Sequence, residues 1–194
     1  MMTNSEIEKR ANDMLAKYVQ RGGAYKAWDK IMTGENIKYR QITTSPDFVG
    51  ALTKGNNGQR YIMTNAAISN DGRRNFTIAH ELGHYALDHH LHSGILICSN
   101  DGIMEEGSAA LAIEREANHF ATCLLMPEEK IRKAFKSMLY NSRRRRNKDF
   151  LYVNKATFGA WCGIRDELTN RYGVSEEALR KRLRSLRLAR FDFS

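Results

Sequence analysis

The feature that most constrains the fold is the stretch RRNFTIAHELGHYALDHH, residues 73–90, which places His80 and His84 four residues apart. On an α-helix, residues four apart lie one turn above each other, with about 5–6 Å between their Cβ atoms. Apolar residues surround the two histidines, as a packed helix requires. Both imidazoles can therefore bind one metal ion. The alternative is a helix whose histidines are ordinary core or surface residues.

Glu81 completes the pattern His-Glu-x-x-His. Zinc binds histidine nitrogen at about 2.0–2.1 Å in a tetrahedral shell, and it lowers the pKa of a bound water to near neutrality. A neighbouring carboxylate can accept the proton of that water. The pattern predicts a zinc site with Glu81 as general base, provided that a third ligand exists. Gly83 between the histidines would be explained if a substrate or another helix passes close by.

The third ligand is expected on a second helix, SAALAIEREANHFATCLLM, which ends at Pro127 and offers Glu114 and Glu116. Two residues apart on a helix means about 200° of rotation, so the two carboxylates cannot face the same metal. Glu114 lies about 55° from the centre of the apolar face and Glu116 about 105°. The spacing therefore predicts Glu114 as the ligand and Glu116 as an exposed charge.

Residues one helical turn from the expected ligands are candidates to orient them. Asn118 follows Glu114 by four residues and could fix a ligating imidazole by a hydrogen bond, and Asp88 stands in the same relation to His84. A purely local hydrogen bond is the alternative for both. The remaining histidines are expected at the wet surface, with a role in steadying an oxyanion as the alternative: His89, His90, His92 and His119.

The rest of the chain predicts an α+β fold. Ser5 and Glu8 form a capping box that predicts a helix over residues 5–20. Three short segments rich in β-branched and aromatic residues predict a small antiparallel sheet, with a hairpin at the turn GNNG. These segments are residues 36–44, 47–54 and 59–65. A loop is expected at residues 98–107, a helix from Pro127 onward, an exposed loop around Arg143–Arg146, and helices to the end.

Two blocks of the sequence resemble the ImmA/IrrE family of zinc metallopeptidases. They are RRNFTIAHELGHYALDH and IEREANHFATCLLMP, in that order, and the resemblance is close over residues 47–127. It implies a zincin-like core of the gluzincin type with zinc as cofactor. His80, His84 and Glu114 would bind the zinc and Glu81 would be the general base. Many relatives carry a histidine where this chain has Asp88.

The resemblance also implies a substrate, because related proteins cleave helix-turn-helix repressors of phage-like or stress-response type and so release transcription. The leading hypothesis is therefore a zinc-dependent endopeptidase that cuts a helix-turn-helix repressor protein. The alternative is a DNA-binding or protein-docking transcriptional regulator whose metal site is structural or inactive.

Charge divides the chain into an expected peptidase domain, residues 1–127, and a basic helical segment, residues 128–194. The segment holds 18 Lys or Arg against 8 Asp or Glu, and the remainder 13 against 14. Gly173 and Ser175 predict the turn and the cap of a helix-turn-helix-like unit. Its second helix carries several cations: Arg180, Lys181, Arg182, Arg184 and Arg187. Contact with DNA, docking of the repressor and packing on the peptidase all remain open.

Cysteine usage and the N-terminus favour a cytoplasmic protein. The three cysteines are far apart and form no CxxC pair, which predicts unpaired thiols: Cys98, Cys123 and Cys162. The N-terminal residues carry charges throughout, so a secretion signal is not expected. No apolar run approaches the length of a membrane span.

Overall fold

The computed structural model describes residues 1–19, 23–89, 95–99, 108–143 and 149–192, and in these it has a mixed α and β fold. The helices are α1 (Asn4–Tyr18), the 3-10 helix η1 (Ala24–Ala27), α2 (Trp28–Gly34), α3 (Asp71–Ala86), α4 (Ser108–Leu125), α5 (Glu128–Arg143), α6 (Phe158–Tyr172) and α7 (Glu176–Ser185). The strands are β1 (Ile37–Ile42), β2 (Phe48–Lys54), β3 (Arg60–Asn65), β4 (Ile95–Ser99), β5 (Leu151–Val153) and β6 (Ala189–Phe191). No helix of the described residues has both the length and the hydrophobicity of a membrane span.

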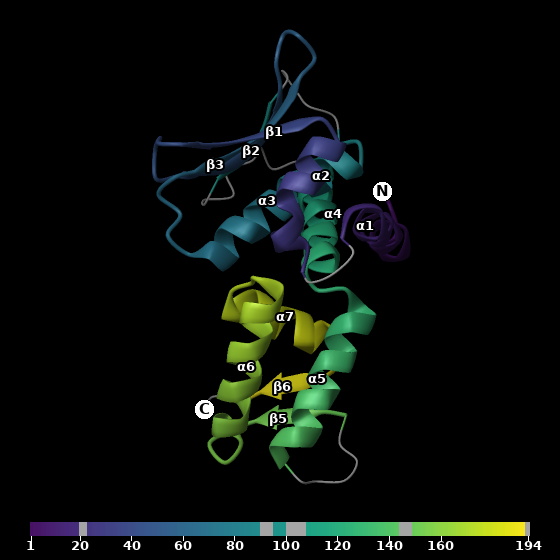
Figure 1. Cartoon of the computed structure of the whole chain (residues 1–194), viewed down its shortest axis with the longest axis vertical. Coiled ribbons are helices and arrows are strands. Elements are labelled where there is room, and N and C mark those ends of the chain that lie inside the picture. Colours follow the sequence, from purple (N-terminus) through teal and green to yellow (C-terminus); the bar gives the residue numbers. More distant parts are fainter. Residues whose placement is uncertain (20–22, 90–94, 100–107, 144–148, 193–194) are drawn as a thin grey trace.

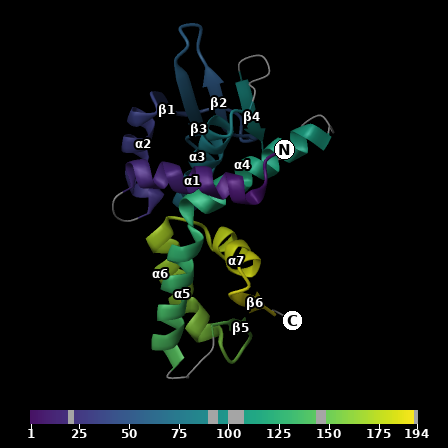
Figure 2. The same cartoon turned by 90° about the vertical axis from the view of Figure 1, so that its right-hand side faces the viewer.

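The elements form two lobes (Figures 1 and 2). The first lobe contains α1 to α4 and a four-stranded sheet, and the second contains α5 to α7 and a two-stranded sheet. The chain passes from one lobe to the other between α4 and α5, at Pro127. Within the first lobe, α3 packs on α4 and against β2 and β3, so the helix that carries the two histidines lies between a helix and the sheet.

The larger sheet has the strand order β1-β3-β2-β4. The predicted hairpin is present, because β2 and β3 pair antiparallel on either side of the GNNG turn. The prediction of a wholly antiparallel sheet is wrong, because β1 pairs with β3 in parallel register. Residue patterns indicate which segments are strands, but they do not show which strands pair. Here the second strand of the following hairpin, β3, lies beside β1, and the two run in the same direction.

Two further sequence predictions need correction. The capping box of α1 is formed by Thr3 and Glu6 rather than by Ser5 and Glu8. The C-terminal segment is not wholly helical, because β5 and β6 pair in parallel. Each of these strands has only three residues, which is too short for an alternating pattern to be recognised. Of the arginine run, Arg143 ends α5 and the other three lie outside the described residues.

Gly83 lies where α3 packs tightly against α4. A Cβ atom at this position would lie 3.0 Å from the backbone oxygen of Ala117 and 3.1 Å from its Cα. The neighbour that the sequence suggested is therefore a helix, α4. Because α3 can come this close, its histidines reach the carboxylate that α4 carries.

We expect Gly83→Ala to destabilise the protein by about 1–3 kcal/mol, because the added methyl group presses on the α4 backbone. Gly163 in α6 is the matched control, since a Cβ there meets nothing within 4 Å. Gly163→Ala should stabilise the protein by roughly 0.5–1 kcal/mol through helix propensity alone. Urea unfolding of the two variants measures the difference, and equal stabilisation by both would contradict the close packing.

The two lobes meet through the turn between α6 and α7. The Asn75 side-chain amide donates to the Gly173 carbonyl at 2.9 Å, and the Tyr25 hydroxyl donates to the Asn170 carbonyl at 2.9 Å. Gly173 has φ 63° and ends α6, and Ser175 caps α7, as predicted. The turn of this helical pair is therefore covered by the first lobe.

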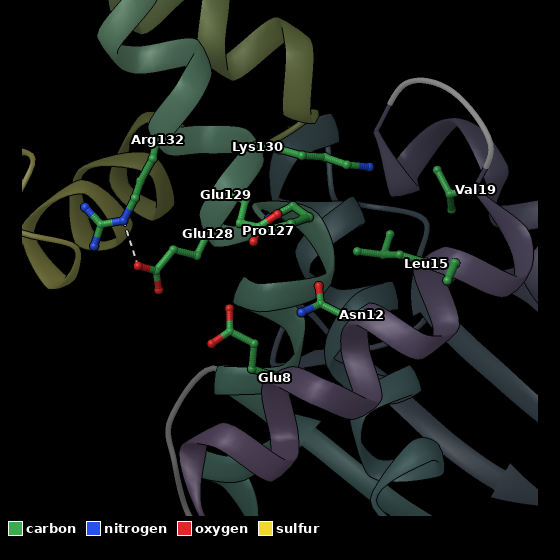
Figure 3. Close-up of a pocket in the computed structure, with 10 residues that line it drawn as sticks. Glu8, Asn12, Leu15, Val19, Pro127, Glu128, Glu129, Lys130 and Arg132 are labelled. Carbon is green, nitrogen blue, oxygen red and sulfur yellow. Dashed lines mark hydrogen bonds and ion pairs between the residues drawn. The ribbon is translucent and has the colours of Figure 1, made fainter.

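Arg182 also joins the lobes, which for this residue agrees with packing on the peptidase, one of the three roles that the sequence left open for the segment. Its side chain is buried, its Nε donates to the Met126 carbonyl at 3.1 Å, and its guanidinium lies 3.9 Å from the Glu8 carboxylate. A cavity of about 710 Å³ lies beside this junction, between α1 and the start of α5 (Figure 3). It is lined by residues that include Glu8 and Pro127 but by no expected metal ligand.

Candidate metal centre

Helix α3 supplies three of the residues that the motif singled out. Asn70 caps the helix by accepting a hydrogen bond from the Arg73 backbone, which fixes where the helix begins. About two helical turns later the chain enters a continuous buried run, in which His80, Glu81 and His84 all lie. The helix therefore presents polar side chains to the interior, where each needs a partner to offset the cost of desolvation.

The partner of the two imidazoles is Glu114 on α4. Its two carboxylate oxygens lie 3.1 Å from His80 Nε2 and 3.3 Å from His84 Nε2. The two Nε2 atoms are 2.9 Å apart. One nitrogen or oxygen from each of the three residues can be chosen so that all lie within 4.8 Å of one another. The structure thus brings together the three residues that the sequence predicts as metal ligands.

The second ring nitrogen of each imidazole, Nδ1, also contacts a neighbouring side chain. His80 Nδ1 lies 3.1 Å from the Asn118 side-chain oxygen, which is the first of the two roles that the sequence allowed for Asn118. His84 Nδ1 lies 2.9 Å from His89 Nδ1. These contacts orient both rings so that their Nε2 atoms point at Glu114, the arrangement in which a histidine can bind a metal.

His89 takes the place that the sequence suggested for Asp88. Asp88 has φ 57° and an 87% exposed side chain, and it pairs with Arg10 at 3.4 Å rather than contacting His84. The positive φ follows the end of α3, where the chain leaves the helical path. This reversal turns His89, rather than Asp88, back toward the His84 ring.

His89 and Glu116 are not the exposed residues that the sequence suggested. Their side chains are 7% and 13% exposed, and His89 Nε2 lies 3.2 Å from a Glu116 oxygen. The other oxygen of Glu116 accepts a hydrogen bond from the Met2 backbone at 2.8 Å. A helical wheel places Glu116 on a side of α4 that faces away from the metal ligands. It cannot show that α1 and the residues just before it cover that side of α4.

The remaining histidines fall into two groups. His119 is half-buried, and its Nε2 lies 3.6 Å from Cys123 Sγ, so the expected surface position is wrong for this residue too. His90 and His92 lie outside the described residues. Cys123 and Cys162 are free thiols, as predicted.

The protonation of the three central residues follows from their surroundings. Burial acts to raise the pKa of Glu114, but hydrogen bonds from the two imidazoles outweigh it and lower the pKa to about 2. Burial lowers the pKa of His84, and the neighbouring His80 and His89 act in the same direction. For His80 burial also acts to lower the pKa, but the carboxylates of Glu114 and Glu81 raise it overall. The cluster therefore keeps an ionised carboxylate and favours a positive charge at its centre.

Glu81 is fully buried on the sheet side of α3, beside β2. A Cβ atom at Gly50 would lie 3.1 Å from a Glu81 carboxylate oxygen and 2.5 Å from a Thr77 methyl carbon. Gly50 is thus a site residue that sequence reasoning missed, although a glycine inside a strand often marks a close approach. Its missing side chain leaves room for the Glu81 carboxylate.

The donor set fits a divalent transition metal. Two imidazole nitrogens and one carboxylate oxygen are a ligand set that zinc takes in catalytic sites. Such sites keep a fourth position for water or substrate. The second contacts of both imidazoles are of the kind that supports metal-binding histidines. The structure therefore defines an α+β protein with a His–His–Glu cluster able to bind a metal.

Comparison with known proteins places this cluster in a family. Residues 33–184 match Peptidase_M78, the IrrE N-terminal-like domain. This match covers most of the 194 residues, so the chain belongs to this family, which confirms the resemblance to the ImmA/IrrE peptidases. No curated protein matches the chain significantly.

A solved structure, named as a Mycobacterium tuberculosis transcriptional regulator, has a similar fold, with a TM-score of 0.57 at 17% sequence identity. The similarity covers 92% of this chain and 46% of that one, so the chain spans about half the length of the regulator. At this identity the likeness concerns the fold alone.

Proposed function

We propose that the protein is a zinc-dependent endopeptidase whose zincin-like core carries the catalytic site. The observation that carries the proposal is the convergence of His80, His84 and Glu114, with Glu81 buried on the same helix as the two histidines. Membership of the Peptidase_M78 family supports the same chemistry. On this proposal residues 1–127 form the catalytic domain, and residues 128–194 form a basic segment that binds a partner molecule.

The roles of the residues follow from their positions. His80, His84 and Glu114 would hold the metal, and Asn118 and His89 would keep the two rings in place. When bound, zinc supplies a Lewis acid that polarises a carbonyl and lowers the pKa of water to near neutrality. Glu81 would accept a proton from the attacking water and pass it to the leaving amine. Its burial keeps bulk water from competing for the carboxylate.

We further propose that the substrate is a helix-turn-helix transcriptional repressor in the cytoplasm, cleaved so that transcription resumes. Two observations support this choice. The family match is to the IrrE N-terminal-like domain, and the similar fold belongs to a protein named as a transcriptional regulator. Related ImmA/IrrE-type proteins act on repressors of this kind.

The test is cleavage of a repressor by the purified, zinc-loaded protein. The probe is the small helix-turn-helix repressor encoded nearest to the gene, and intact-mass spectrometry detects its fragments. We expect one cleavage event, its loss on chelation with 1,10-phenanthroline and its return when zinc is added. Fragments that form equally fast in the presence of the chelator would contradict a zinc peptidase.

A further inference from the structure

One side of α7 carries a row of cations. Arg180 and Arg184 are one helical turn apart, and Arg187 follows just past the end of the helix. Arg184 and Arg187 are exposed and Arg180 is half-buried. The neighbouring side, about 100° around the helix, is apolar and buried, and holds Leu179, Leu183 and Leu186. The helix thus packs by its leucines and presents this row, which we call the arginine face, at the surface.

Two members of the arginine face are held in place by an aromatic ring. The guanidinium of Arg180 lies 4.8 Å and that of Arg184 5.1 Å from the centre of the Phe191 ring. Phe191 is itself fixed by an edge contact with the buried Trp161. Stacking on a ring orients a guanidinium while its hydrogen-bond donors stay available. It also holds two like charges close together, an arrangement that an anionic partner would stabilise.

Arg184 and Arg187 differ from two other cations of α7, which have partners within the protein. Lys181 pairs with Glu177 at 2.7 Å, and Arg182 is buried at the junction of the lobes. Within the described ranges, no carboxylate lies within 4.0 Å of the guanidinium nitrogens of Arg184 or Arg187. Both charges are therefore available to a partner.

The helical pair is not placed to read bases. In helix-turn-helix proteins the first residues of the second helix contact base edges. Here the first turn of α7 carries Glu176 and Glu177, which phosphates repel. A Cβ atom at Gly72 would lie 2.4 Å from the Ser175 backbone nitrogen, so the start of α3 packs on the same turn. The cations lie instead toward the C-terminal end of α7.

We propose that the arginine face binds the sugar–phosphate backbone of duplex DNA without regard to sequence. At the helical rise of about 1.5 Å per residue, the seven-residue step from Arg180 to Arg187, which ends just past the helix, spans about 10 Å. Each DNA strand carries one phosphate per 3.4 Å of axis, so roughly three phosphates fit the row. Guanidinium groups suit phosphate because they donate two parallel hydrogen bonds. The net charge of +9, whose excess lies in residues 128–194, attracts the same polyanion from a distance.

This binding is independent of the proposed peptidase activity, although it would bring a peptidase close to DNA-bound repressors. Fluorescence anisotropy with a labelled 20-base-pair duplex, measured at several salt concentrations, tests it. The test variant is Arg180→Gln/Arg184→Gln/Arg187→Gln. The matched control is Lys130→Gln/Lys133→Gln/Lys155→Gln, which removes the same charge from exposed positions of the same lobe.

We expect the arginine variant to bind on the order of tenfold more weakly at 50 mM salt, and its log–log salt slope to fall by about 2–3. The lysine variant should keep most of the affinity, and Glu81→Gln should bind as well as the wild type. Equal loss in both triple variants would show a net-charge effect and overturn the proposal. Equal competition by polyglutamate of matched charge would assign the face to an acidic protein instead, and absence of binding at low salt would also overturn it.

Discussion

Replacing Glu81 with glutamine should leave zinc binding within about threefold of the wild type and lower repressor cleavage by about 10²–10⁴-fold, the usual contribution of a general base. Glutamine keeps the shape of the side chain but cannot accept the proton of an attacking water. Because Glu81 is fully buried beside Gly50, an isosteric change is needed to keep the packing intact. Zinc content by mass spectrometry and cleavage rates by quantified fragments are the two measurements.

The control for Glu81→Gln is Glu116→Gln, the same chemical change on a carboxylate that faces His89 rather than the centre of the cluster. This control should retain most of its cleavage rate at saturating zinc. If Glu81→Gln cleaves the repressor as fast as the wild type, Glu81 is not the base and the catalytic proposal fails.

The second large effect is expected from Glu114, whose oxygens lie within 3.3 Å of both Nε2 atoms. Glu114→Gln should weaken zinc binding more than about 100-fold, because loss of a direct ligand exceeds the 10–100-fold effect of outer contacts. Glu116→Gln and His89→Gln act only through His84, so each should fall within that smaller range. Competition titration with a chromophoric chelator gives the three affinities.

The order of these affinities distinguishes the two carboxylates of α4. If Glu116→Gln proves as damaging as Glu114→Gln, the assignment of ligand and supporting residue must be exchanged. Circular dichroism of each variant, recorded without zinc, shows whether a loss of affinity arises from unfolding rather than from the missing ligand.

The sequence predicts the inner part of the site well because helical geometry relates residues that are close in the chain. His80, Glu81 and His84 share one helix, and the rotation between Glu114 and Glu116 separates a residue facing the apolar side from one beside it. Asn118 follows from the same periodicity. Each of these inferences needs only the pitch of a helix and a buried face.

The outer part of the site could not be predicted, because it depends on turns and on packing between distant segments. His89 reaches His84 only because Asp88 adopts φ 57° after the end of α3. Gly50 approaches Glu81 because α3 lies on β2. The parallel pairing of β1 with β3 and the burial of Arg182 between the lobes have the same origin, since both are tertiary contacts between separate segments.

X-ray absorption spectroscopy of the zinc-loaded protein, compared with Glu114→Gln, tests the central claim most directly. The account predicts two histidine nitrogens at about 2.0–2.1 Å and oxygen neighbours at about 2.0–2.2 Å, with one oxygen contribution lost in the variant. A sulfur neighbour near 2.3 Å, or identical spectra for the two proteins, would contradict a centre built from His80, His84 and Glu114.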